Sequence, residues 1–409
     1  MSERVSRIAG AGFDHVELTP ELLSAPIAAT QTREFSEKVA HALANPIGLP
    51  GLAQCVTPDD RIAIAVAPGA YAAPIVAEAI AVELAKAGIE TKQITVVVAS
   101  KNDLMRFEEF EGSELRVELH DPDDDDMLCF AGMTRVQRAL MLNRELFDAD
   151  MVLPVTSVGA AAIDDGPYGQ AYPAFFDRKA IQRTQRVGAL AATLESENRQ
   201  GARRKEAEEA GWMLGVPMGV YVIPDWCGGF EGVVVGDPVT AYEQAKSAYT
   251  ERQQSPQEPS ELVVAMLSGS VYEQTWDALA DALEAIEPLR APGGAVAVWS
   301  EIEQPMAEAA RRWMNNDTGK DVPPEFLDES GPDAWIAWRL ISAIKKGPTF
   351  LRTRLTTDEI ENLGVTPLES ADELIHLAGR SASCVLVEGA QHASFAAEVG
   401  APLSDEGGQ

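Results

Sequence analysis

Arg61-Ile-Ala-Ile-Ala-Val-Ala67 and Gln93-Ile-Thr-Val-Val-Val-Ala99 are two short apolar runs separated by a helical stretch, Pro74 to Ala87. Each run is continuously apolar, which is typical of a strand buried on both faces of a sheet. The stretch between them begins with proline and ends at Gly88, as helices commonly do. A strand, a helix and a strand of these lengths predict a parallel β-α-β unit with a right-handed crossover.

The same alternation of strand and helix continues on both sides of a polar segment, Gln253 to Ser260, which contains two prolines and no large apolar residue. Such a segment is typical of a linker. We therefore predict an α/β protein with two domains, mainly parallel sheets flanked by helices, and a cleft between them. The predicted boundaries are 1–252 for the N-terminal domain, 253–261 for the linker and 262–409 for the C-terminal domain. The first 30 or so residues are predicted to be irregular.

The composition restricts the class of partner. The chain of 409 residues has 64 acidic and 33 basic residues and a net charge of −31. A surface of this sign repels nucleic-acid phosphates and anionic membranes, so we expect neither as a partner. Four scattered cysteines without a CxxC pair, and a start without a signal-peptide pattern, predict a soluble cytoplasmic protein.

Ligands of open parallel sheets bind beyond the carboxyl ends of the strands. The loops in that position are 68–71, 100–103, 156–171 and 268–270. None of them holds the glycine pattern of a dinucleotide or phosphate cradle, and a Gly-x-Ser-x-Gly nucleophile turn is missing too.

Few side chains near these loops suit acid–base chemistry. His392 follows the last predicted strand and lies on the expected ligand edge. His120 borders the acidic run Asp121 to Asp126, which suits either a bound cation or a solvated acidic loop. The run lacks the glycine and the final glutamate of an EF-hand, which favours the loop.

Two further clusters leave alternatives open. Asp164, Asp165 and Tyr168 could form a polar pocket wall, although an Asp-Gly-Pro turn explains the same residues. Arg178 and Lys179 could hold an anion or form an ordinary solvated pair.

Ala44-Asn-Pro-Ile-Gly48 precedes the first strand, and Asp148-Ala-Asp-Met-Val-Leu-Pro154 leads into a later one. With this order of segments the sequence resembles the nickel-dependent lactate racemase family, whose L-x-N-P-I-G element and later strand these two stretches match. The resemblance implies two domains with a cleft between them and a small 2-hydroxy acid as substrate. It also implies a nickel pincer nucleotide joined to a lysine, a histidine ligand to nickel and two histidines that exchange protons with the substrate.

The family's functional residues do not carry over to this sequence. The family's D-H-T-R loop corresponds to Pro68-Gly69-Ala70-Tyr71, and Asp103 stands where the resemblance places the first catalytic histidine. The window Val158 to Gly169 has neither the lysine nor the histidine of the cofactor site, and Gly188 to Ala191 has no second catalytic histidine. The substrate-contacting glutamine and lysine of the second domain fall near Ala278 and Asp281.

Three hypotheses follow. The first is a lactate racemase-family protein without nickel-pincer racemase activity, which binds a small polar ligand in the cleft and has no cofactor or metal site. The nickel pincer nucleotide is expected only if the family chemistry survives. The second is an active isomerase or redox enzyme acting on a small 2-hydroxy acid with other groups, Asp103 as the catalytic candidate. The third is an interaction protein that uses its acidic surface. The ligand-binding candidates are Tyr71, Lys101, Asp164, Asp165, Tyr168, Arg178, Lys179 and His392.

Overall fold

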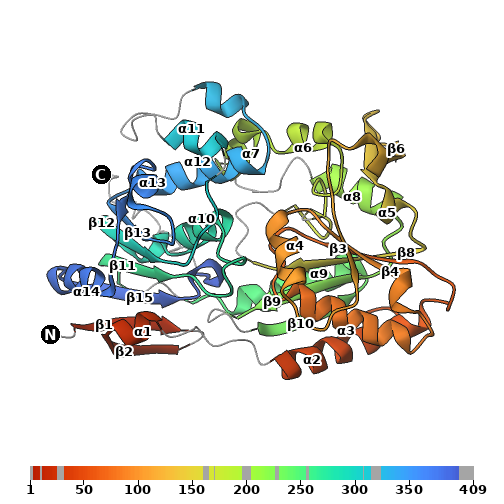
Figure 1. The fold of residues 1–409 in the computed structure, drawn as a ribbon, viewed down its shortest axis with the longest axis horizontal. Coiled ribbons are helices and arrows are strands. Elements are labelled where there is room, and N and C mark those ends of the chain that lie inside the picture. The colour runs from red at the N-terminus through yellow and green to blue at the C-terminus, as the bar shows by residue number, and fades with distance from the viewer. Residues whose placement is uncertain are drawn as a thin grey trace, which may run out of the picture.

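The computed structural model describes residues 3–9, 12–24, 32–159, 165–169, 171–195, 204–225, 230–254, 258–306, 308–314 and 324–395. It consists of two α/β bodies side by side, each built on one large sheet (Figure 1). The predicted fold class is therefore confirmed. Among the described residues, no helix is both long and apolar enough to cross a lipid bilayer.

The first sheet has six strands in the order β10-β9-β8-β3-β4-β5. All neighbours are parallel except β9 and β10, which form an antiparallel hairpin. The strands are β3 (Ile62–Val66), β4 (Ile94–Val98), β5 (Arg116–Leu119), β8 (Met151–Ser157), β9 (Gly219–Pro224) and β10 (Phe230–Gly236). The predicted β-α-β unit is β3, α3 (Ala73–Ala85) and β4.

Both faces of this sheet are covered. Along β3 the side chains alternate between two cores, Ile62, Ile64 and Val66 on one face and Ala63 and Ala65 on the other. Burial on both faces explains why the run is continuously apolar. The covering helices are α2 (Thr32–Ala44), α3, α4 (Lys101–Glu108), α5 (Arg144–Phe147), α6 (Arg178–Thr184), α8 (Arg204–Met213) and α9 (Pro238–Glu251). α7 (Val187–Glu195) packs instead against the second body, where Val187 joins the core.

The second sheet has seven strands in the order β14-β13-β12-β11-β15-β1-β2. Its strands are β11 (Ser260–Met266), β12 (Arg290–Trp299), β13 (Thr349–Arg352), β14 (Thr366–Pro367), β15 (Cys384–Glu388), β1 (Glu3–Ala9) and β2 (Gly12–Leu18). Around it lie α1 (Pro20–Ser24), α10 (Trp276–Ala285), α11 (Glu308–Met314), α12 (Pro332–Ile344), α13 (Thr357–Glu361) and α14 (Ala371–Arg380).

The expectation of an irregular N-terminal segment is wrong. β1 and β2 form an antiparallel pair, and β1 also pairs in parallel with β15, nearly 400 residues along the chain. Val5 and Ile8 of β1 are buried in the second body. The local pattern of β1 is too sparsely apolar to predict a strand, because the pairing partner that satisfies its backbone is distant in sequence. Part of the predicted domain 1–252 thus belongs to the second sheet, and the division at 253–261 stays a prediction.

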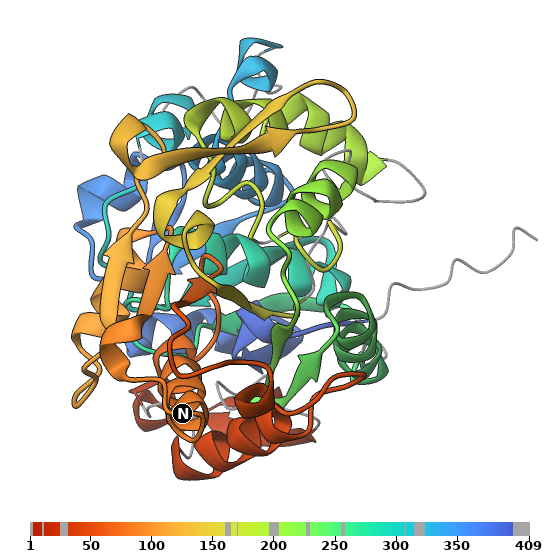
Figure 2. The ribbon, with the colours of Figure 1, turned by 90° about the vertical axis from the view of Figure 1, so that its right-hand side faces the viewer.

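The connections also include short 3-10 helices and a separate two-stranded ribbon. The 3-10 helices are η1 (Leu52–Gln54), η2 (Thr91–Gln93), η3 (Asp125–Met127), η4 (Glu287–Leu289), η5 (Pro324–Asp328) and η6 (Ala390–His392). The ribbon pairs β6 (Leu128–Met133) with β7 (Ala139–Asn143) and lies across the outside of the first body (Figure 2).

Candidate functional site

The loops that follow the parallel strands of the two sheets meet between the two bodies. Tyr71, after β3, packs edge-on against His392, after β15, with ring centroids 5.6 Å apart. Arg106 of α4 donates to the carboxylate of Glu273, after β11, with Nη2 and Oε1 3.0 Å apart. In Figure 1, α4 lies on the side of the first body that faces the second. Carboxyl ends of parallel strands are where open α/β sheets bind ligands, so these contacts define the candidate site.

Hydrogen bonds join the loops of three neighbouring strands of the first sheet. Gly69 has φ +69°, which turns its amide toward Asp103 at 3.2 Å from Oδ2. The amide of Tyr71 donates to Ser157 Oγ at 2.7 Å. The left-handed backbone at Gly69 favours glycine, and it lets the turn after β3 reach the start of α4.

Asp103 is buried at the start of α4. Ser100 caps this helix, since its Oγ accepts from the Asp103 amide at 3.1 Å. The Ser100 hydroxyl in turn donates to Asp103 Oδ2 at 2.5 Å, and Arg106 Nη1 donates to Oδ1 at 3.0 Å. Together with the Gly69 amide, these donors give the buried carboxylate three hydrogen-bonding partners, which offset the cost of its burial.

Arg106 bridges the two bodies. Its guanidinium is buried between Asp103 of its own helix and Glu273 of the second body. Glu273 also accepts from the Ser270 amide at 2.8 Å, in a turn where Gly269 has φ +89°. The cluster of these three side chains carries two negative charges and one positive charge. It therefore attracts neutral or cationic groups more than anions.

His392 is the last residue of η6, a 3-10 helix that begins directly after Gly389, where φ is +61°. Burial lowers the pKa of its imidazole to about 4, while the charges of Glu273 and Asp281 oppose that shift. The ring is therefore neutral at neutral pH, with one nitrogen able to donate and the other able to accept a hydrogen bond. Gln391, its neighbour, is tied to the loop after β11 by a bond from its Nε2 to the Ser268 carbonyl at 2.9 Å.

Residues 14–161 match the model of the lactate racemase N-terminal domain. This part of the chain belongs to the lactate racemase family. The matched segment runs from β2 to the loop after β8, and so includes Tyr71, Asp103 and Arg106 of the site, whereas Glu273 and His392 lie beyond it.

Two solved structures share the fold of this chain. The lactate racemase apoprotein from Thermoanaerobacterium thermosaccharolyticum superposes with a TM-score of 0.63 at 14% identity, over 97% of this chain and 100% of the other. A protein from Thermotoga maritima gives a TM-score of 0.64 at 12% identity, over 88% and 98%. At such identities the likeness establishes the fold alone. No match is found among curated proteins.

Of the residues predicted from sequence, the lactate racemase-like fold brings Tyr71, Asp103 and His392 together, with Lys101 exposed at the start of α4. Arg178 has other partners. Its guanidinium forms an ion pair with Asp123, with Nη2 and Oδ2 2.7 Å apart. The hydrogen bond between these groups raises the pKa of Arg178. The neighbouring Lys179 is exposed.

Asp165 is buried, and Tyr168 is half-buried against Gly211 of α8. Burial raises the pKa of Tyr168, with the charges of Asp237 and Glu208 adding to the shift. Asp164 lies outside the described residues. The functional roles predicted for this group stay predictions.

The acidic run builds local structure. Asp121 accepts from the Asp123 amide at 2.9 Å and Asp124 from the Asp126 amide at 3.0 Å, which forms the turn and η3. Beside it, His120 is buried, with Nε2 3.0 Å from the Phe176 carbonyl, and burial lowers its pKa. Both observations favour the solvated loop over a cation site.

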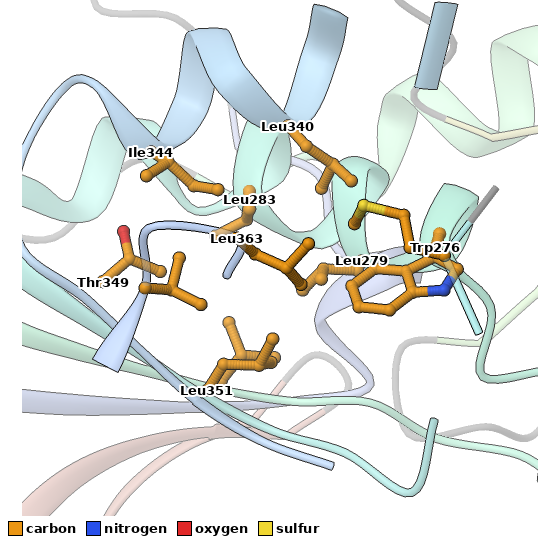
Figure 3. Close-up of a pocket in the computed structure, with 11 residues that line it drawn as sticks. Trp276, Leu279, Leu283, Leu340, Ile344, Thr349, Leu351 and Leu363 are labelled. Atoms are coloured by element: carbon orange, nitrogen blue, oxygen red, sulfur yellow. The ribbon is translucent and has the colours of Figure 1, made fainter. Parts of the chain in front are cut away.

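A hollow within the second body is lined by apolar side chains. Figure 3 shows it between α10, α12 and strands of the second sheet, lined by side chains such as Trp276, Leu283, Leu340 and Leu351. A space with such walls offers water or a polar ligand almost no partner, so it belongs to the packing of the core.

Sequence reasoning missed Arg106 and Glu273, which hold the site together. A signal for each was present. Arg106 stands three residues after Asp103, on the same face of a helix, and Glu273 stands three residues after Ser270, a spacing typical of a turn closed by a side chain.

Proposed function

We propose that this lactate racemase-family chain binds a small, uncharged polar molecule between the two bodies and does not perform nickel-pincer racemisation. The observation that carries the proposal is the Asp103–Arg106–Glu273 cluster, with its buried aspartate and arginine, beside a neutral His392. Hydroxyl and amide groups of a ligand would find donors and acceptors there, whereas a carboxylate would meet the surplus negative charge of the cluster.

The family cofactor does not fit the side chains at this position. A nickel pincer nucleotide would need a lysine for attachment and imidazole donors for the metal. The window Val158 to Gly169, where the resemblance implies both, has neither a lysine nor a histidine. Where the resemblance implies the first catalytic histidine, the carboxylate of Asp103 is held by Gly69, Ser100 and Arg106.

The alternative is an enzyme acting on an anionic 2-hydroxy acid. Its support is Lys101, a cation at the N-terminus of α4, the end of a helix that favours anions. Asp103 would then be the base, which requires that it give up its bond to Arg106. The need to break this buried bond is why we favour the binding function.

Lactate and lactamide separate the two functions, because they have nearly the same shape and differ in charge. We expect calorimetric titration to show lactamide binding at least about tenfold more tightly than L- or D-lactate, a difference of about 1.4 kcal/mol. Glu273→Gln removes one negative charge and should reduce this preference. Arg178→Ala, away from the cluster, is the matched control and should leave it unchanged.

Tighter binding of lactate than of lactamide would overturn the electrostatic argument. Intact mass and metal analysis of the purified chain test the second half of the proposal. A nucleotide-sized adduct on a lysine, together with nickel and racemisation of lactate, would refute it.

A further inference from the structure

The ribbon of β6 and β7 has an apolar face turned away from the protein. Phe130 is paired with Met141 and Met133 with Ala139 across the ribbon. These four lie on the face opposite Leu140, which is fully buried. Phe130 is 55% exposed and Met133 43% exposed. Exposed aromatic and methionine side chains gathered on one face are typical of a surface that binds another protein.

One edge of the ribbon is covered and the other is not paired with a strand. On the β7 side, the Asn143 amide donates to the Phe175 carbonyl and the Asp177 amide to the Met141 carbonyl. Among the described residues, β6 pairs with β7 alone. A bulge between Phe130 and Gly132 interrupts β6, so a continuous ladder with another strand is unfavourable there. The apolar face, more than the backbone edge, is the surface available for docking.

The two ends of the ribbon differ in charge. The base of the ribbon is the end where β6 begins, and the exposed carboxylates of Asp124, Asp125 and Asp126 lie just before it. At the tip stands Arg135, whose side chain is 92% exposed and 4.0 Å from Glu209. The base keeps its negative sign even with the nearby Arg144, which bonds to the Asp126 carbonyl.

The acidic base and the exposed Arg135 at the tip make the ribbon complementary to a second copy of itself. When two ribbons pack face to face with their strands antiparallel, the base of one lies over the tip of the other. Arg135 of each copy then meets the Asp124–Asp126 base of its partner, twice in one two-fold interface. In a chain of net charge −31, most pairs of surfaces repel each other, whereas this one is complementary to itself.

We propose that the outer face of the β6–β7 ribbon docks a second copy of this chain, so that the protein is a two-fold dimer in solution. The apolar side chains Phe130 and Met133 form the centre of the contact. Arg135 and the acidic base form its rim and set the antiparallel orientation.

Sedimentation equilibrium of the full chain at physiological salt tests the proposal. We expect a dimer whose dissociation constant rises at least about tenfold in Phe130→Ser, equivalent to about 1.4 kcal/mol. Arg135→Glu should weaken the dimer as well. Because this side chain is almost fully exposed, its replacement does not threaten the fold. Combining Arg135→Glu with Asp126→Arg exchanges the two charges and should restore the dimer.

The matched control is Val82→Ser, which removes an apolar side chain that is 60% exposed on α3. It should leave the dissociation constant unchanged. A chain that is monomeric under these conditions overturns the proposal. So does a dimer that is insensitive to both Phe130→Ser and Arg135→Glu, because its interface would lie elsewhere.

Discussion

Arg106 and Arg339 are two buried arginines with different partners. Arg106 lies between the two bodies, and of its two carboxylate partners Asp103 is itself buried. Arg339, on α12, is held within the second body by three carboxylates of α10, namely Asp277, Asp281 and Glu284. Those three are partly exposed to water, Asp277 by 55%.

The solvation of the carboxylate partners, more than their number, decides how much each buried arginine contributes to stability. Without Arg339, water can solvate the three carboxylates of α10. Without Arg106, the carboxylate of Asp103 stays in a place that water does not reach. Removing one member of a buried ion pair leaves the other uncompensated, which costs far more than losing a solvated pair.

Arg106→Gln should therefore have the largest effect. We expect the free energy of unfolding to fall by about 3 kcal/mol in urea denaturation, because Asp103 keeps only the bonds from Gly69 and Ser100. Adding Asp103→Asn should recover part of this loss, since the stranded charge is removed. A fall of less than about 1 kcal/mol in the single variant would contradict the buried-pair argument.

Arg339→Gln should destabilise the protein less, by about 1–2 kcal/mol, although it breaks contacts with three carboxylates. The same urea denaturation measures it beside Arg106→Gln. If Arg339→Gln lowered the free energy of unfolding as much as Arg106→Gln or more, the argument from the exposure of the carboxylate partners would be wrong.

Two groups of the second body, His392 and Asp277, should change the stability in opposite directions as the pH varies. Burial lowers the pKa of His392 to about 4, so the unfolded chain binds its proton more readily than the folded one. The stability that the neutral ring contributes is complete above its ordinary pKa of about 6.5 and is lost as the pH falls toward 4. His392→Phe, which keeps a ring against Tyr71, should flatten the melting temperature over this range. An unchanged slope would show that the imidazole is solvated.

Asp277 should act in the opposite direction. Partial desolvation of its carboxyl beside α12, with the charge of Asp281, raises its pKa to about 6 against the effect of Arg339. The folded chain then holds this proton more tightly, so stability is lost as the pH rises from about 4 to about 6. Asp277→Asn should remove that loss. Because the side chain is half exposed, water moderates the effect, and the change of slope should be smaller than for His392→Phe.

Arg178→Ala should have the smallest effect, because both Arg178 and Asp123 are exposed. We expect the unfolding free energy to change by no more than about 0.5 kcal/mol. A larger change would mean that this pair fixes the acidic loop against α6.

The core strands and their helices could be predicted from sequence because the signal is local. β3, α3 and β4 each have an apolar pattern that is complete within a few residues. β1 could not be predicted, since its partner β15 is at the other end of the chain. The ribbon was missed for a related reason: one of its faces is apolar without being buried, so its pattern is typical neither of a core strand nor of a loop.

Some features of the candidate site could likewise be predicted from local sequence, and others could not. The sequence by itself determined which loops follow the parallel strands, and through them that Tyr71, Asp103 and His392 lie on ligand edges. Only the tertiary structure decided that these edges face each other, that Asp103 is bonded to Arg106, and that Glu273 completes the bridge. The physical reason is that periodicity and turn residues act over a few positions. A buried charge is placed by whatever partner the fold brings to it, here a carboxylate 167 residues along the chain.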